Sequence, residues 1–269
     1  RSVNDLADTI REAFLVAQNG RPGPVLVDIP KDITAATAEY NPPSVDLLCE
    51  DHTSLARASI RRVTKIMSPS DQEVQDIAAV INESQRPFLY VGGGVVIDNA
   101  CQELMTLAER RNIPVATSLM GKSAFPSRHP LCCGMIGMHG TKAANMGANK
   151  SDLVIAIGAR FSDRVISDST KFARNSKILH IDIDPAEINK NIKVDVAVLG
   201  DCKETLAELT KLVREKKHTE WIASFEEHEK NEYDNVIAKE IYPKEGPLNM
   251  GEVVRAVSEA TNHEAILVT

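Results

Sequence analysis

Between residues 71 and 216 the hydrophobic pattern switches repeatedly from the spacing of an amphipathic helix to the unbroken apolar run of a buried strand. An apolar run without polar alternation is typical of a strand covered on both faces, as in a parallel sheet. Strands that alternate with helices specify a doubly wound sheet with right-handed crossovers. We therefore predict one complete, Rossmann-like α/β domain with a doubly wound parallel sheet over residues 71–216.

The elements of this domain are expected to follow one another closely. Strands are predicted at residues 88–92, 114–119, 153–157, 178–183 and 196–199, and helices at residues 71–83, 98–111, 141–149 and 203–215. The stretch between the second and third of these strands, rich in Gly, Pro and Cys, is predicted to be a loop.

A partial segment of another α/β domain is predicted before it. Residues 4–19 carry apolar side chains at helical spacing, and the breaker G-R-P-G-P leads into an apolar strand at residues 25–29. One strand cannot form a sheet, so we assign residues 1–33 to the end of a separate domain. Residues 34–70 show no sustained period and contain N-P-P, which predicts an extended linker.

A second partial segment is predicted after the domain. Residues 217–247 are strongly charged with scattered aromatic side chains, and we expect a helical connector packed on the domain surface. Residues 248–269 contain a predicted helix at 249–261 and end in the apolar run A-I-L-V-T, residues 265–269. Such a run predicts the first strand of a further α/β domain.

The most informative stretch is R-P-F-L-Y-V-G-G-G, residues 86–94, in which a buried strand ends in three glycines. Glycines at a strand end let the backbone approach a bulky anion, such as a phosphate at the mouth of an open α/β sheet. They also suit a tight strand-to-helix turn that binds no ligand. The glycines alone leave both interpretations open.

Composition narrows the class of partner. The 269 residues are 43% hydrophobic and 26% charged, with no apolar run long enough to span a membrane. A net charge of −7 and a pI near 5.6 argue against a nucleic-acid partner. The first residues show neither a signal-peptide core nor an initiating Met, so we expect the chain to begin inside a longer protein.

Five cysteines without a C-x-x-C motif predict structural thiols in a reduced, cytoplasmic-type compartment. The adjacent Cys132 and Cys133 have no His or Asp at ligand spacing, so no metal site is predicted in this chain.

Two phosphate-binding motifs are matched only superficially. A-T-S-L-M-G-K-S at 116–123 fits a relaxed phosphate loop, but Pro126 and Pro130 follow where a helix would have to start. Gly200-Asp201-Cys202 resembles the start of a G-D-G metal-diphosphate motif, but Cys replaces the second Gly. We therefore predict neither a nucleotide hydrolase nor a metal-diphosphate site here.

Polar and glycine residues gather at predicted strand ends, where an open α/β sheet presents its ligand crevice. Arginines there suit a pyrophosphate, and acidic residues suit ribose hydroxyls. The pattern therefore favours a dinucleotide. The nicotinamide fingerprint is not met, because Ile97 stands at the place of its third glycine.

Five motifs resemble the catalytic subunit of acetolactate synthase (acetohydroxyacid synthase), a thiamine-diphosphate enzyme. They are G-R-P-G-P-V-L-V-D-I-P-K-D at 20–32, Y-V-G-G-G at 90–94, G-M-I-G-M-H-G-T-K-A-A-N at 134–145, G-A-R-F-S-D-R-V at 158–165 and H-I-D-I-D-P-A-E-I-N-K at 180–190. The last three are specific to that enzyme. The resemblance implies that residues 1–33 end the pyrimidine-binding domain, residues 71–216 form the central domain, and residues 248–269 begin the diphosphate-binding domain.

The resemblance further implies that the central domain binds FAD in an extended pose. It assigns Gly92, Gly93 and Gly94 to the pyrophosphate and ribityl region; Ser118, Leu119, Met138, His139 and Gly140 to the flavin half; Gly158, Arg160, Arg164 and Val165 to the middle; and Asp182, Ile183, Asp201 and Cys202 to the adenosine end. A further arginine before the domain is expected, with Arg62 or Arg61 as the nearest candidate. Ser162, Lys122 and Ser118 depart from the usual residues of these motifs.

Catalysis, by the same resemblance, takes place outside this chain. Thiamine diphosphate and Mg²⁺ would be bound by the flanking domains, so no catalytic residue is assigned here. The implied full-length enzyme decarboxylates pyruvate and transfers the two-carbon unit to pyruvate or 2-ketobutyrate. A homo-oligomer, a small regulatory subunit and a cytoplasmic location are also implied. Two alternatives stay open: a flavin-free scaffold domain, and another carboligase or oxidase of the superfamily.

Overall fold

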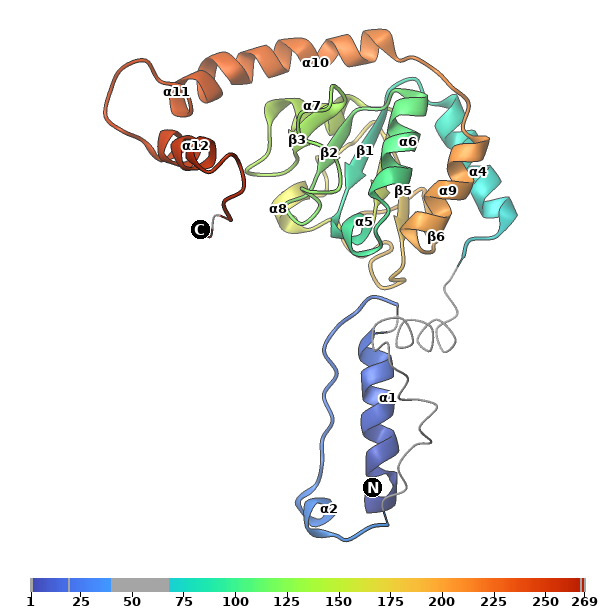
Figure 1. The fold of residues 1–269 in the computed structure, drawn as a ribbon. Helices are drawn as coiled ribbons and strands as arrows, with labels where there is room; N and C mark the ends of the chain where they lie inside the picture. The colour runs from blue at the N-terminus through green and yellow to red at the C-terminus, as the bar shows by residue number, and fades with distance from the viewer. Residues whose placement is uncertain (1, 19, 40–67, 267, 269) are drawn as a thin grey trace.

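The centre of the molecule is a six-stranded, all-parallel sheet (Figure 1). The structure, a computed structural model, describes residues 2–18, 20–39, 68–266 and 268. Along the chain the strands are β1 (Pro87–Val91), β2 (Val115–Thr117), β3 (Cys132–Met135), β4 (Leu153–Ile157), β5 (Lys177–Asp182) and β6 (Val196–Leu199). Their order in the sheet is β3-β2-β1-β4-β5-β6. The first three strands extend the sheet to one side and the last three to the other, so the point at which the strand order reverses lies between β1 and β4. The predicted doubly wound α/β fold is confirmed.

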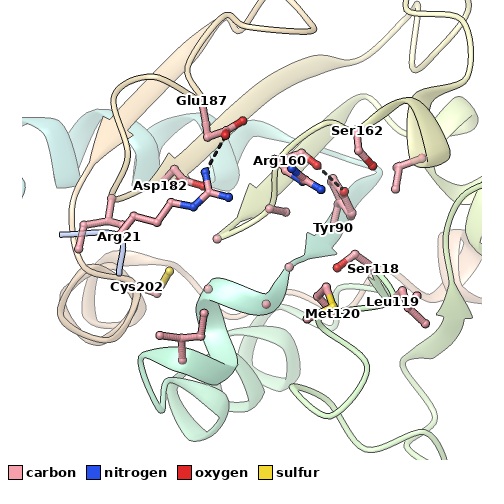
Figure 2. A pocket seen from close by; sticks show the side chains of 18 of the residues that line it. Arg21, Tyr90, Ser118, Leu119, Met120, Arg160, Ser162, Asp182, Glu187 and Cys202 are labelled. Carbon is pink, nitrogen blue, oxygen red and sulfur yellow. Dashed lines mark hydrogen bonds and ion pairs between the residues drawn. The ribbon is translucent and has the colours of Figure 1, made fainter. Parts of the chain in front are cut away.

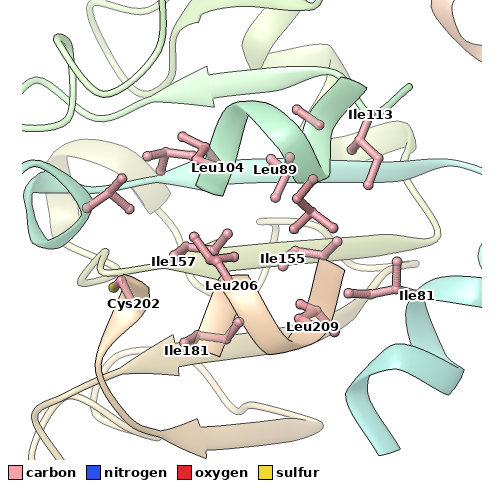
Figure 3. Close-up of a cluster of buried hydrophobic side chains, with 14 of the residues drawn as sticks. Ile81, Leu89, Leu104, Ile113, Ile155, Ile157, Ile181, Cys202, Leu206 and Leu209 are labelled. Atoms are coloured by element: carbon pink, nitrogen blue, oxygen red, sulfur yellow. The ribbon is translucent and has the colours of Figure 1, made fainter. Parts of the chain in front are cut away.

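Side chains of the central strands divide between two cores. In β1, Leu89 and Val91 pack into one buried cluster, and Phe88 and Tyr90 pack into the other. Every residue of β1 and β4 is buried, because helices cover both faces of the sheet. Figure 3 shows the first cluster, in which Leu104 and Leu206 from two helices meet the strands. The unbroken apolar runs of the sequence therefore correspond to strands covered on both sides.

Helices cover each face. α4 (Asp71–Glu83), α5 (Gly93–Ile97), α6 (Cys101–Arg111) and α9 (Cys202–Leu212) contribute to the first cluster. α7 (Lys142–Lys150), α8 (Asp163–Ile166) and α10 (Thr219–Glu232) contribute to the second. Their starts follow the sequence: Ser70 and Glu73 form a capping box on α4, and the Asp201 side chain caps α9.

The charged connector is held to the domain by its first turns. Trp221 and Phe225 of α10 are buried, and the Trp221 indole Nε1 donates to the Pro87 carbonyl at 2.9 Å. The Phe225 ring lies parallel to that of Phe88, with centroids 6.3 Å apart. A π-helical turn (Tyr233–Ile237), α11 (Ala238–Glu240) and α12 (Met250–Ala260) follow. This part of the chain is therefore helical, and its first turns pack on the domain.

In the part of the chain that the structure describes, neither predicted flanking segment forms a strand. Residues 25–29 follow a short 3-10 turn (Val3–Asp5) and α1 (Leu6–Gln18) and have no strand hydrogen bonds before α2 (Lys31–Ala35). The described residues among 265–269 are likewise not strand. A strand needs a neighbour to bond its backbone, and within the described part of the chain neither segment has one. The side chain of Leu26 is accordingly 92% exposed.

Other differences are smaller. The edge strand β3 lies where a loop was predicted, because its sequence, C-C-G-M, has no apolar run. The glycines open a short helix that was not predicted, α5, and α6 begins three residues later than predicted. Most of the predicted linker, residues 40–67, lies outside the described residues. No helix within the described ranges has the length and apolarity that a membrane span requires.

Candidate functional site

A cavity of about 910 Å³ opens where the chain reverses across the sheet, beyond the carboxyl ends of β1, β4 and β5 (Figure 2). This is the position at which open α/β sheets bind ligands, and the volume lies in the range of about 300–1,000 Å³ found for small-molecule sites. The predicted site residues that line it are Gly92, Gly93, Gly94, Ser118, Leu119, Met138, His139, Gly158, Arg160, Arg164, Val165, Asp182, Ile183, Asp201 and Cys202.

One predicted residue does not line the cavity, and another falls outside the part of the chain that the structure describes. Gly140 is packed behind it, where a Cβ would lie 2.3 Å from the Met135 carbonyl oxygen. Arg62 lies outside the described residues. Among the described residues before the domain, Arg21 in the G-R-P-G-P turn lines the cavity. A signal for it was present, because that turn belongs to one of the five motifs.

The glycine run brings two loops into backbone contact. The Gly92 amide donates to Ile157 O at 3.0 Å, and the Gly94 amide donates to Gly158 O at 3.0 Å. A Cβ on Gly92 would lie 2.0 Å from Gly158 O, closer than any real contact. These two amides are already bonded, so positive charge for an anionic ligand must come mainly from elsewhere in the cavity.

Arginine side chains supply that charge at the end of β4. The Tyr90 hydroxyl, on β1, donates to the Arg160 carbonyl at 3.0 Å and holds the loop that carries this arginine (Figure 2). Burial of Tyr90 raises the pKa of its hydroxyl, so the group remains a neutral donor. Arg160 and Arg164 are both solvent-exposed, and each lines the cavity. Guanidinium groups in such a place suit phosphate oxygens.

Carboxylates lie at the other end, beyond β5 and β6. Asp182 and Glu187 are buried, and Arg21 donates to Glu187 Oε1 at 2.7 Å and to Asp184 Oδ2 at 3.1 Å. These hydrogen bonds, led by the one to Glu187, raise the pKa of Arg21. Burial opposes ionisation of Glu187, but hydrogen bonds from Lys190 and Arg21 outweigh it and lower its pKa. The cavity is therefore polarised, with cations near β4 and carboxylates near β5.

A pair of carboxyl groups, Asp98 and Asp201, completes the acidic end. Both accept from the Lys203 amide, at 2.7 Å and 3.0 Å respectively. Burial first, and then the hydrogen bond with Asp201, raise the pKa of Asp98 to about 7. Asp98 was not predicted, because a polar residue after a short helix carries no distinctive signal.

Replacing Asp98 with asparagine is expected to flatten the pH dependence of stability. The folded pKa of about 7 exceeds the ordinary 3.8, so the folded state binds more protons between these values. The contribution of protonated Asp98 to the free energy of unfolding is complete below pH 3.8 and is lost as the pH rises through about 7. Asp98 is partly exposed, so the effect is reduced by solvent screening. As the pH rises from 5 to 8, the free energy of unfolding of D98N should increase by about 1–2 kcal/mol relative to that of wild type.

Urea unfolding of both proteins at several pH values measures this difference. Asp201 offers no matched control, because its side chain also caps α9. Parallel pH profiles for D98N and wild type would contradict the assignment of the raised pKa to Asp98.

Among the described residues, the side chains that could bind a metal ion or act as nucleophiles do not form such a site. In the ranges that the structure describes, no group of three or more His, Cys, Asp or Glu side chains could hold a metal ion. Burial raises the pKa of the Cys133 and Cys202 thiols, which keeps both protonated and poorly nucleophilic. No helix follows residues 116–123 before β3, so the phosphate-loop motif is not one structurally. The arrangement suits binding of an extended, partly anionic ligand.

The sheet order, the two-faced core and a cavity at the switch point define a doubly wound α/β ligand-binding domain. The sequence model of the thiamine pyrophosphate enzyme central domain matches residues 74–209, which are just over half of the chain. The chain therefore belongs to the thiamine pyrophosphate enzyme family, and its residues 74–209 match the central domain of that family.

The curated relatives are described as acetolactate synthases. The chain is 45% identical over 205 residues to a probable acetolactate synthase large subunit of Methanocaldococcus jannaschii, with 76% of the chain and 33% of that relative covered. It is 43% identical over 225 residues to the acetolactate synthase large subunit of Corynebacterium glutamicum, with 81% of the chain and 34% of that relative covered. An acetolactate synthase of Mycobacterium leprae is 38% identical over 275 residues, covering 100% and 41%. The predicted resemblance is confirmed, and the chain spans 33–41% of these relatives' length.

Proposed function

We propose that this chain is the FAD-binding central part of an acetolactate synthase catalytic subunit. The observation that carries the proposal is the polarity of one cavity: arginines beside β4 and carboxylates beside β5 line the same space. FAD has a pyrophosphate in its middle and an adenosine at one end, so an extended molecule fits this order of charges. Leu119, Met120 and Met138 supply exposed apolar surface for the flavin half.

Individual roles follow from this placement. Arg160 and Arg164 would bind the pyrophosphate, while Asp182 and Asp201 would accept from the ribose hydroxyls. Arg21 would close the adenosine end, where it is held by Glu187 and Asp184. Glu187 Oε2 is buried without a hydrogen-bond partner among the described residues, so the acidic end has spare acceptor capacity. In this family FAD has no net redox role in forming acetolactate, and its place here is structural.

We propose the same activity for the full-length protein as the names of the relatives state. Pyruvate would be decarboxylated and its two-carbon unit transferred to pyruvate or 2-ketobutyrate. Thiamine diphosphate and Mg²⁺ would lie in domains before residue 34 and after residue 247, with residues 34–70 as a linker and residues 71–216 as the FAD domain. We also propose a homo-oligomer, a small regulatory subunit and a cytoplasmic location, as the family resemblance implies.

One observation favours the second candidate, a flavin-free scaffold. Gly92 and Gly94 are explained by backbone packing against Gly158 alone, so the glycine run does not itself require a ligand. The absorbance spectrum of the purified full-length protein separates the two. We expect flavin absorbance, or its appearance on titration with FAD. A protein that shows none and takes up none would establish the scaffold.

The 269-residue segment on its own is expected to bind FAD weakly and to form no acetolactate. The missing domains would wall part of the cavity, so the segment offers less contact area. A colorimetric acetolactate assay with thiamine diphosphate, Mg²⁺ and pyruvate checks this, with the full-length protein as positive control. Product from the segment would show that catalytic groups lie within it.

A further inference from the structure

The Asn145 side chain brackets a single residue, Gly137, which stands between two residues of the cavity lining, Ile136 and Met138. Its Nδ2 donates to the Gly137 carbonyl at 3.0 Å, and its Oδ1 accepts from the Gly137 amide at 3.0 Å. Gly137 has φ of +112°, a conformation that L side chains rarely adopt. The carboxamide therefore fixes the backbone on both sides of a residue with an unusual conformation.

Gly137 joins two walls of the cavity. The next residues, Met138 and His139, line the cavity, and the Met138 amide donates to the Arg164 carbonyl at 2.9 Å. Gly137 itself packs so closely that a Cβ would lie 2.5 Å from the same carbonyl oxygen. A shift of Gly137 would consequently move both the Met138–His139 wall and the loop that carries Arg164.

The helix that carries Asn145 is a rigid base. α7 starts at a Thr141 cap, which accepts from the Ala144 amide at 3.1 Å, and lies beside β3 (Figure 1). Its Gly147 packs against the rings of Phe88 and Phe225, so the helix is fixed to the second core. Asn145 does not line the cavity and has no direct access to a ligand there.

We propose that Asn145 is a positioning residue, which keeps the flavin-half wall and the Arg164 loop in their binding geometry. The inference rests on the proposed function only in naming FAD as the ligand. Without the bracket, Gly137 loses a donor and an acceptor, and its carbonyl keeps only the Gly140 amide, at 2.9 Å. The cavity wall would then have to be ordered by the ligand, at the expense of affinity.

The test compares Asn145→Asp with Asn149→Asp in the full-length protein. Asp at 145 keeps an acceptor for the Gly137 amide but turns a carboxylate towards the Gly137 carbonyl. Asn149 lies one turn further on α7, is exposed, and bonds Asn145 O and the Ala173 amide instead of the cavity loop. We expect FAD affinity to fall about 10- to 100-fold in N145D and less than about 3-fold in N149D.

Visible circular dichroism of bound flavin supplies a readout that loss of stability alone would not change. We expect an altered flavin signal in N145D and a wild-type signal in N149D. Asn145→Ser serves as a milder variant if N145D folds poorly. Lower melting temperatures with unchanged FAD affinity and flavin spectrum in the folded protein would overturn the proposal.

Hydrogen exchange in the ligand-free protein separates this inference from the proposed function. N145D should speed exchange of the Met138 amide, which bonds the Arg164 carbonyl, relative to wild type and N149D, whether or not FAD binds. Unchanged exchange at this amide would overturn the positioning role. Absence of FAD binding by wild type, with faster exchange in N145D, would refute the proposed ligand and support the role of Asn145.

Discussion

Replacement of Gly92 by alanine is expected to destabilise the domain by about 3 kcal/mol or more and to eliminate binding at the cavity. The added Cβ would meet Gly158 O at 2.0 Å and Ala159 Cα at 2.4 Å, both backbone atoms. Relief requires separating the ends of β1 and β4, which breaks the Gly92 N to Ile157 O bond. Urea denaturation followed by circular dichroism, with FAD titration in the full-length protein, measures both effects.

Gly93→Ala is the matched control. A Cβ at Gly93 meets Met120 Cβ at 3.1 Å and Met120 O at 3.3 Å, so the loop at Met120 needs to shift by only a few tenths of an ångström. We expect this variant to unfold within about 1 kcal/mol of wild type. Equal denaturation midpoints for G92A and G93A would mean that the loops at β1 and β4 are not in close backbone contact.

The sequence predicted the sheet well wherever strands are covered on both faces. Leu153 to Ile157 is an unbroken apolar run because two cores need side chains from the same strand. β3 was missed for the opposite reason: it is an edge strand, and Cys133 is its one fully buried residue. Residues 25–29 carry a strand pattern without forming a strand, because pairing depends on a partner that local sequence does not contain.

The site was predictable to the extent that it is made of strand ends. Arg160 and Asp182 lie just after β4 and at the end of β5, so parallel topology brings them together. Arg21 was not found, because its approach to Glu187 spans 166 residues of sequence and depends on the path of the chain before the domain. Glu187 and Asp98 were missed because a turn and a helix end give no periodic signal.

The glycines show a limit of motif interpretation. The sequence left a phosphate cradle and a tight turn equally open for Gly92–Gly94. Close approach of two loops explains Gly92 and Gly94 in the absence of any ligand, whereas a Cβ at Gly93 would require only a small shift of Met120. A motif of small residues can therefore be required by packing at a binding site, and the charged residues nearby are better evidence for the ligand.

Truncation of Trp221 to alanine is expected to cost about 3–5 kcal/mol of stability. The indole is 7% exposed, packs edge-on against Phe225 at 4.8 Å, and donates to Pro87 O. W221A removes this anchor and leaves the β1 carbonyl of Pro87 without its donor. Trp221 is the single tryptophan of the sequence, so W221A has no tryptophan fluorescence that could report unfolding. Far-UV circular dichroism should therefore follow the urea unfolding of all variants.

Two further variants divide this effect between packing and hydrogen bonding. Trp221→Phe keeps an aromatic ring but removes the donor, and should cost about 1–3 kcal/mol. Tyr233→Ala, further along the connector at a residue 51% exposed, should change stability by less than about 0.5 kcal/mol. If W221A and Y233A had similar midpoints, α10 would not be anchored through Trp221. We expect W221A to be the least stable, W221F to be intermediate and Y233A to be the most stable of the three. This order follows because the first turns of the connector supply Trp221 and Phe225 to the domain core.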